Sequence, residues 1–304
     1  MIRIDMRRGP FRQTDIYYPT VGELRHCFEN VGFTEVVNIH QAPIDWKLRS
    51  RYLKRREIFP NLHIDLTRSL DDIFGAMHAR SARYLIRKAE RLGDRIAIKR
   101  NDATAVSDYV EMHNRFVDIK GLARISMRRL SILAPVSDVF VAYFDGRPIC
   151  GHVWVRDCQS SRVGAHLGAS VRLEDRGAPV TPLNRYLYWY LIKLYKHEGF
   201  RLYDLGGAGP EAQGVADYKR YFGAQPAMEY VYVLAGPLAR LAMETRAMIR
   251  EAAHRRARVL GVESDDRAEG HCVNIAAEGN SKGSAFDSFN PLRRPADKQF
   301  DLRR

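Results

Sequence analysis

The chain has 304 residues, 45% of them hydrophobic, and its 49 Lys and Arg against 36 Asp and Glu give a formal net charge of +13. This length allows one large domain or two small ones, and the apolar fraction is enough for a real core. No run approaches the roughly 20 apolar residues of a membrane span, and no apolar segment follows the charged N-terminus as in a secretory signal. We therefore expect a globular, cytoplasmic protein without a transmembrane segment.

The net positive charge and the cysteine spacing indicate which partners and which cysteine chemistry to expect. A cationic surface concentrates anionic partners such as tRNA, the phosphates of coenzyme A or anionic lipid headgroups. The excess lies in 46–56, 80–91 and 240–258, where solvated helix faces are an equally good explanation. The cysteines lack Cys-x-x-Cys spacing, so we expect free thiols at all four positions: Cys27, Cys150, Cys158 and Cys272.

The first 65 residues predict a short α/β segment. Thr20 followed by Glu23 is a capping-box pattern that opens a helix ending at Gly32. Residues 35–39 then form a β-type run.

A helix with a basic stripe is predicted next. Ser69 precedes an acidic first turn, and apolar residues follow an approximate helical period until Gly93. Arginines recur along this helix at steps of three and four residues, which predicts a stripe on one face: Arg80, Arg83, Arg87 and Arg91.

The central region predicts several strands. A strand at 95–99 and a helix at 103–118 precede two β-rich runs joined by Asp145-Gly146, a strong hairpin signal. In the next strand, 162–171, one face is nearly bare around His166. That bare face indicates close approach by a ligand, tight helix packing or a bulge, and the sequence leaves these three open.

The segment after this strand has the features of an anion site. Arg176, Gly177 and Ala178 lead to Thr181, which we expect to cap a helix that has Pro182 at its first position and ends near Gly199. Amide groups at such a helix start point outward with partial positive charge.

The most informative stretch follows. A strand-like run ending in Asp204 and Leu205 leads into Gly206-Gly207, and the next short segment carries Tyr218-Lys219 and ends in Phe222-Gly223. Glycine allows close backbone approach, and a lysine just beyond it can face developing negative charge.

This stretch, together with Gly214 and the basic helix at 81–93, resembles the acyltransferases of the GNAT superfamily, particularly the FemABX-like branch of peptidoglycan-bridge aminoacyltransferase type. The resemblance covers about 66–235. It implies a mixed α/β fold with a mostly antiparallel sheet flanked by helices, and a transfer of an acyl or aminoacyl group to an amine. The acceptor is expected to be a cell-envelope precursor, a polysaccharide amino sugar or a small amine.

The resemblance also implies site residues. Lys219 matches the lysine that stabilises charge during transfer, and Tyr218 would orient it through a cation-π contact. The other explanation is a group of core aromatics with Lys219 pointing to solvent. Asp204 is a candidate base or acceptor-positioning group, or simply a turn cap. His166 and His152 are further candidate bases, although buried histidines are more often structural.

The donor stays open between acyl-CoA and aminoacyl-tRNA, with no permanently bound cofactor and no metal. Only Arg176, Gly177 and Ala178 echo the GNAT pyrophosphate loop, whereas FemABX-type enzymes generally use aminoacyl-tRNA. The remaining donor or substrate contacts that we expect are Asn184, Gly206, Gly207, Tyr218, Arg83 and Arg87. Metal hydrolysis, NTPase and serine hydrolase motifs are lacking.

We divide the chain into an abbreviated N-terminal α/β segment at 1–65, a GNAT-like domain at 66–260 and a disordered tail at 261–304. The basic amphipathic helix expected beyond Pro237 caps the domain or lies on RNA or a membrane. Contact with the anionic inner face of the membrane would make the protein peripheral. The alternative class is a nonenzymatic RNA- or membrane-surface-binding protein built on an acyltransferase scaffold.

Overall fold

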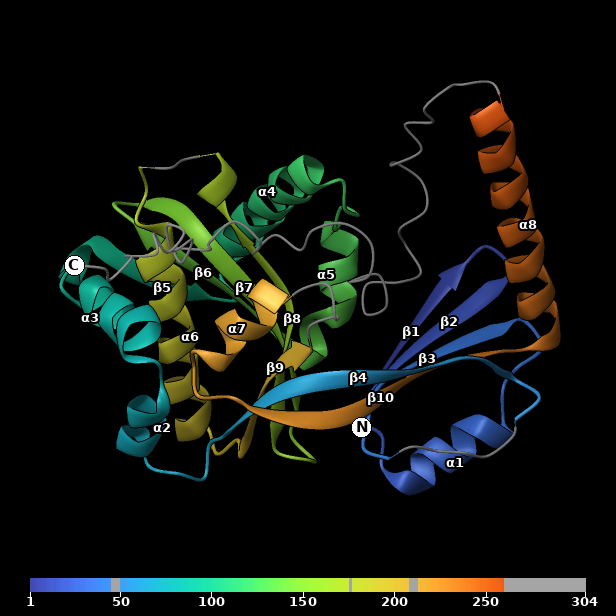
Figure 1. Ribbon diagram of the computed structural model, residues 1–304, viewed down its shortest axis with the longest axis horizontal. Coiled ribbons are helices and arrows are strands. Elements are labelled where there is room, and N and C mark those ends of the chain that lie inside the picture. Colours follow the sequence, from blue (N-terminus) through green and yellow to red (C-terminus); the bar gives the residue numbers. More distant parts are fainter. Residues whose placement is uncertain (45–49, 175–176, 208–212, 260–304) are drawn as a thin grey trace, which may run out of the picture.

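One ten-stranded sheet runs through the computed structural model, which describes residues 1–44, 50–174, 177–207 and 213–259 (Figure 1). The strands, in spatial order, are β1 (Ile2–Arg8), β2 (Phe11–Tyr17), β3 (Glu35–Ala42), β10 (Gln225–Ala235), β4 (Leu53–Asp65), β9 (Leu202–Gly207), β8 (Arg162–Ser170), β7 (Arg147–Asp157), β6 (Ser137–Phe144) and β5 (Ile96–Arg100). Neighbours are antiparallel except for the β2–β3 and β8–β9 pairs. The predicted mixed, mostly antiparallel sheet is confirmed.

Helices flank this sheet and make the two parallel connections. They are α1 (Val21–Glu29), α2 (Leu70–Ala76), α3 (Tyr84–Glu90), α4 (Ala103–Lys120), α5 (Met127–Leu133), α6 (Val180–His197), α7 (Gln213–Arg220) and α8 (Pro237–Val259), with short turns η1 (Ala79–Arg83), η2 (Gly93–Arg95), η3 (Ala134–Val136) and η4 (Val171–Leu173). Helix α1 joins β2 to β3, and α6 joins β8 to β9. A parallel pair needs such a crossover because its strands run in the same direction.

Two buried apolar clusters lie along the sheet. The larger one surrounds Trp154, whose ring stacks on that of Tyr203 at a centroid distance of 4.4 Å. The smaller one packs α1 against β3 and β10 around Leu24, Phe28 and Tyr232. Long pairing between β4 and β10, from Gln225 opposite His63 to Leu234 opposite Leu53, spans the sheet between them. The domain division at residues 65 and 66 stays a prediction, and the tail at 261–304 lies outside the described residues.

Two short sequence motifs, a capping box and a hairpin turn, predicted the local structure correctly. The Thr20 hydroxyl accepts from the amide of Glu23 while the Glu23 carboxylate accepts from that of Thr20, so the predicted capping box is confirmed. The β6–β7 hairpin turns at Asp145 and Gly146, whose φ values of 49° and 76° are those of a type I′ turn.

The helix predicted from Ser69 to Gly93 is broken. Met77 is extended, with ψ of 146°, and ends α2. The side chain of His78 then accepts a hydrogen bond from the amide of Ser81 and caps the π-helical turn η1, which leads into α3. The chain restarts its helix here because a side chain satisfies the new N-terminal amide.

Helix α6 begins at Val180, two residues earlier than predicted. Its N-terminal boundary residue is Pro179, and no side chain caps the helix, so the assignment of Thr181 as N-cap is wrong. The φ of −75° at Pro179 is fixed by its ring and already suits the start of a helix.

The bare face of β8 has two physical explanations in the structure. A side chain at Gly164 would come within 1.9 Å of the Tyr18 hydroxyl, so glycine makes room for that ring. The pairing with β7 shifts between Val153, opposite Leu167, and Trp154, opposite Ala165, which leaves His166 at a bulge. Strand β8 pairs with β9 only from Arg162 to Gly164.

The cysteines are free thiols where the structure describes them: Cys27 and Cys150 are buried and Cys158 is exposed, whereas Cys272 lies outside the described residues. Of the helices in the described ranges, none has the length and apolar character needed to cross a membrane.

Candidate active site

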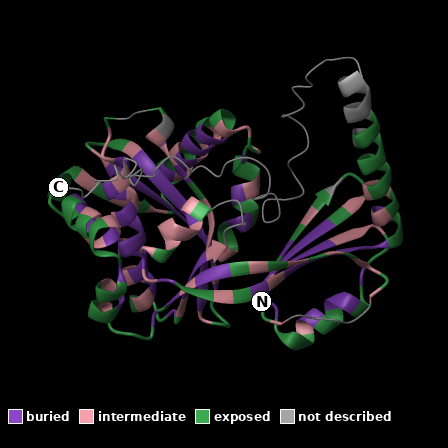
Figure 2. Cartoon of the chain, in the orientation of Figure 1, coloured by how far each residue is buried: buried purple, intermediate pink, exposed green. Residues whose placement is uncertain are grey.

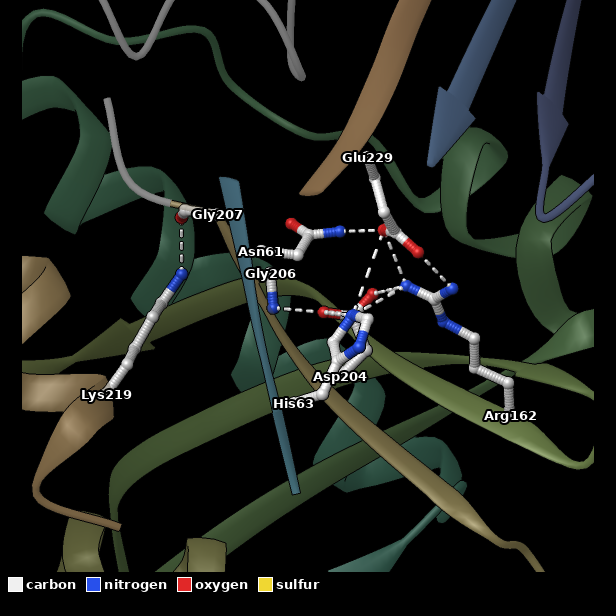
Figure 3. Close-up of polar contacts among 8 residues, drawn as sticks. All are labelled: Asn61, His63, Arg162, Asp204, Gly206, Gly207, Lys219 and Glu229. Carbon is white, nitrogen blue, oxygen red and sulfur yellow. Dashed lines mark hydrogen bonds and ion pairs between the residues drawn. The ribbon is translucent and has the colours of Figure 1, made fainter. Parts of the chain in front are cut away.

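Strand β9 and helix α7 bring Lys219 onto the double glycine. The Lys219 ammonium donates a hydrogen bond of 2.6 Å to the carbonyl oxygen of Gly207 (Figure 3). The backbone turns sharply at Gly206, whose φ of +73° is the left-handed region that glycine adopts without steric cost. A side chain at Gly207 would collide with the ring of Phe59 and with the carbonyl of Pro60. The two glycines are therefore required by the backbone path.

The charge of Lys219 is held in a partly desolvated setting. Its side chain is half-buried, and burial lowers its pKa to about 8, opposed by the charge of Asp204. Within the described part of the chain, no carboxylate lies at ion-pair distance from this ammonium, and an ammonium has three donors. Lys219 therefore retains donors that can turn toward an oxyanion.

A buried ion cluster lies next to this turn. Arg162 donates to Asp204 Oδ2 at 2.6 Å and to Glu229 Oε1 at 2.5 Å, and its guanidinium lies 3.0 Å from Nε2 of His63. Asn61 donates to Glu229 from the neighbouring strand. We call these five residues, Asn61, His63, Arg162, Asp204 and Glu229, the Arg162 cluster; Figure 3 shows that they come together from β4, β8, β9 and β10.

The Arg162 cluster is covered by the N-terminal segment. The Arg162 guanidinium lies 4.2 Å from the ring centroid of Tyr18, which lies just beyond β2. A cation over an aromatic face in a desolvated setting is stabilised electrostatically. The first 18 residues therefore contribute directly to the environment of Asp204.

His63, Asp204 and Glu229 have ligand atoms within 4.8 Å of one another, a spacing compatible with a metal ion. The Arg162 guanidinium contacts all three of these side chains. A bound cation would be repelled by that guanidinium, and Arg162 already supplies the positive charge that the two carboxylates need. The arrangement fits an arginine-centred ion cluster better than a metal site.

Asp204 is placed as a support for the turn. It is fully buried, its Oδ2 accepts from Arg162, and its Oδ1 accepts from the amide of Gly206 at 2.7 Å. Both oxygens of the Asp204 carboxylate are therefore occupied, one by a guanidinium and one by a backbone amide. The sequence left three roles open for Asp204, namely a base, an acceptor-positioning group and a turn cap, and its contact with the Gly206 amide is the one expected of a turn cap.

Of the two candidate histidines, His152 is buried and His166 is half-buried. His166 packs against Tyr17 with ring centroids 5.9 Å apart, and burial lowers its pKa to about 3. His152 contacts Asn184 through Nε2 at 2.8 Å, and burial lowers its pKa to about 4. Because the amide of Asn184 donates to the Tyr218 hydroxyl, its oxygen is left to accept from His152. His152, Asn184 and Tyr218 thus form a hydrogen-bonded chain that reaches α7.

Two buried histidines, His113 on α4 and His152 on β7, predict acid sensitivity. The pKa values of His113 and His152 are about 4 in the folded protein against 6.5 for the free side chain. Between these values the unfolded state binds more protons, so the free energy of unfolding falls as the pH is lowered from 6.5 toward 4. Denaturant melts across this range should show the decline, and His152→Gln should make it shallower. A variant with the same pH dependence as the wild type would contradict this assignment.

Arg185 is a site residue that the sequence analysis missed. It is buried, its guanidinium lies 3.7 Å from the ring centroid of Tyr218, and it donates to the Tyr218 carbonyl at 3.2 Å. The sequence analysis had expected a cation-π contact between Lys219 and Tyr218. Among the described residues, the cation over the Tyr218 ring is instead Arg185. The signal was an arginine between Leu183 and Leu187 on the apolar side of α6.

The remaining predicted contacts are dispersed. Arg83 is half-buried, whereas Arg87 is exposed with its guanidinium 5.5 Å from the ring centroid of Phe74. Gly177 and Ala178 lie just before Pro179, the boundary residue of α6. Arg176 lies outside the described residues. One group is thus formed by Lys219, Gly206, Gly207 and Asp204. Tyr218 is next to Lys219 on α7, and Asn184 on α6 donates to its hydroxyl. Arg83 and Arg87 lie apart from this group, in the α2–α3 region.

Comparison with known proteins identifies the fold. No protein-family model matches the sequence, and no curated protein sequence matches it. The crystal structure of FemX aligns over 79% of this chain and 85% of its own, with a TM-score of 0.56 and 11% identity. The chain has a GNAT-like fold of the FemABX type. The fold class expected from the sequence is confirmed, and the resemblance is confirmed at the level of the fold.

Two further structures align at lower scores. The C-terminal domain of a protein named as a lysylphosphatidylglycerol synthetase, from Agrobacterium fabrum, gives a TM-score of 0.49 at 12% identity, covering 81% of this chain and 85% of that chain. L-PGS from Bacillus licheniformis gives 0.47 at 11% identity, covering 77% and 80%. At such identities the likeness concerns the fold, so the reaction must be argued from this chain's residues.

Proposed function

We propose that this protein transfers an acyl or aminoacyl group from an activated donor, acyl-CoA or aminoacyl-tRNA, to an amine. The observation that carries the proposal is Lys219, a half-buried ammonium anchored by one hydrogen bond to Gly207 at the end of β9. The FemABX-type fold, on which Lys219 follows the Asp204 to Gly207 motif, supports it.

The chemistry needs a neutral amine and a stabilised oxyanion. The amine nitrogen attacks the carbonyl carbon of a thioester or ribose ester, a C–N bond forms, and the carbonyl oxygen becomes negative. The Lys219 ammonium supplies a donor for that oxygen. Collapse breaks the C–S or C–O bond, the thiolate or ribose oxygen leaves, and the proton lost from the amine neutralises it directly or through solvent.

In this proposal the role of the Arg162 cluster is to position the Lys219 ammonium. Arg162 fixes Asp204, Asp204 accepts from the amide of Gly206, and the carbonyl of the following residue, Gly207, anchors Lys219. A donor held by a rigid backbone loses little freedom when the oxyanion forms. The Arg162 cluster therefore sets where the ammonium lies.

A protein base is not needed for this proposal. His152 and His166 have pKa values of about 4 and 3, well below neutral pH, and the basic strength of a group falls with its pKa. An acceptor amine that is already neutral attacks without help. The rate is then expected to rise with the neutral fraction of the amine.

The pKa of Lys219 predicts that the transfer rate falls at high pH. The oxyanion donor must be protonated, so with a pKa of about 8 the transfer rate should fall as the pH rises through that value. Lys219→Arg keeps its charge to much higher pH and should move this decline upward, at a lower maximal rate. The check is the transfer rate at saturating donor against pH, with an acceptor amine of low pKa. A decline that stays near pH 8 in Lys219→Arg would assign it to another group.

A two-donor assay tests the proposal itself. The purified chain is incubated with acetyl-coenzyme A or mixed aminoacyl-tRNA and with a panel of amines that includes amino sugars and cell-envelope precursors. The products are weighed by mass spectrometry. Transfer from either donor supports the proposal and identifies the donor, and steep loss of binding with salt is expected for tRNA but not for coenzyme A. Binding without transfer to any amine would favour the nonenzymatic scaffold.

A further inference from the structure

Helix α8 presents an apolar stripe to solvent. Leu241, Met248 and Ile249 are 59%, 67% and 64% exposed, and their spacing of seven and eight residues places them on one face. Figure 1 shows α8 following β10 at one end of the molecule, and Figure 2 shows that its surface is largely exposed. Large apolar side chains gathered on one exposed face indicate an interaction surface.

The contacts that hold α8 to the body of the protein lie behind the stripe and along one edge of it. Ala239 is buried, Arg240 donates to the carbonyls of Arg51 and Leu53 at 2.8 Å, and Glu244 accepts from Lys54 at 2.6 Å. Ala239 lies about 200° around the helix from Leu241. The apolar stripe is therefore turned outward and is left over after the contacts that fix the helix are made.

The charge of α8 indicates which partner fits the apolar stripe: a second copy of the helix, RNA or a lipid surface. The segment Pro237–Val259 holds six arginines against two glutamates, a balance of +4 in a chain of net charge +13. Two copies of this helix pairing through their stripes would bring like charges together. RNA would satisfy the charge but offers no apolar phase for Leu241, Met248 and Ile249. An anionic lipid surface satisfies both requirements.

We propose that α8 lies in the interface of an anionic membrane, with Leu241, Met248 and Ile249 inserted among the lipid chains and arginines near the headgroups. Arg246 is exposed and lies about 60° around the helix from Ile249, so it is one of the arginines expected near the headgroups. Insertion of apolar side chains and attraction to anionic lipid add to each other. The proposal stands apart from the transfer reaction, because docking requires neither donor nor acceptor.

Vesicle sedimentation of the full chain tests the proposal. The vesicles are phosphatidylcholine alone or equal parts phosphatidylcholine and phosphatidylglycerol. The variant is Leu241→Ser/Met248→Ser/Ile249→Ser. The matched control is Ile58→Ser/Met228→Ser, which removes apolar side chains that are 56% and 57% exposed on β4 and β10. Circular dichroism and a thermal melt check that every variant folds.

The wild type should sediment with the anionic vesicles and little with the neutral ones, and added salt should weaken this binding. The triple variant should lower the vesicle partition coefficient by about tenfold or more, and the control by less than about twofold. Arg246→Glu should lower it as well. Unchanged binding in the folded triple variant, or equal binding of the wild type to neutral vesicles, would overturn the proposal. So would a wild-type dimer in solution that the triple variant converts to a monomer.

Discussion

Replacing Lys219 with alanine is expected to lower kcat for transfer by about a hundredfold to a thousandfold, with little change in the KM for the donor. The ammonium interacts with charge that develops only as the tetrahedral intermediate forms, so its loss affects the chemical step. The measurement is steady-state transfer with the donor that the two-donor assay identifies. Lys219→Arg should retain part of the activity because the cation remains.

Arg220→Ala is the matched control for this variant. Arg220 is the next residue on α7, is exposed and pairs with Asp217 at 3.0 Å, so its removal takes a cation from the same helix without touching Gly207. We expect its kcat to stay within about twofold of the wild type, since surface ion pairs contribute little. Equal losses in Lys219→Ala and Arg220→Ala would contradict a specific role for Lys219.

Arg162→Met is expected to lower the free energy of unfolding by about 3–5 kcal/mol. Arg162 is buried and donates to Asp204 and Glu229, which are buried themselves. Removing only the arginine leaves two carboxylates without their cation in a desolvated setting. Denaturant unfolding at neutral pH measures the loss.

Two comparisons make this prediction specific. Arg124→Ala breaks an exposed ion pair with Asp118 at 2.5 Å and should leave the free energy of unfolding almost unchanged. Arg162→Met combined with Glu229→Gln should recover part of the stability, because one of the stranded charges is then removed. A loss in Arg162→Met no larger than in Arg124→Ala would show that the cluster is not the buried ion network described above.

Elements with a strong local signal were predicted from the sequence, and elements that depend on distant partners were not. The β6–β7 hairpin was found from Asp145-Gly146 because the turn chemistry lies within two residues. Strand β4 was missed because it contains Pro60 and a basic run, and its first eight residues alternate between half-buried and exposed. Its partners β9 and β10 follow it by more than a hundred residues.

The same limit applies to the candidate site. Lys219 and the double glycine were identified because they lie in one short motif. The Arg162 cluster was not, since its hydrogen-bonded partners are separated by 42 to 168 positions in the chain and are brought together only by strand order. Arg185 was overlooked because an arginine on an apolar helix face usually reaches solvent, whereas here the rings of Tyr218 on α7 and of Phe222 just beyond it cover the guanidinium.

The most direct measurement is the ranking of transfer rate and donor binding in two variants, Lys219→Ala and the combined Arg83→Ala/Arg87→Ala/Arg91→Ala. Our account predicts that Lys219→Ala binds donor nearly as the wild type does and loses most of its turnover, while the arginine variant loses less turnover. Contradiction would come from Lys219→Ala with the turnover of the wild type, together with an arginine variant that no longer binds. In that case the protein would be a binding scaffold with an acyltransferase fold.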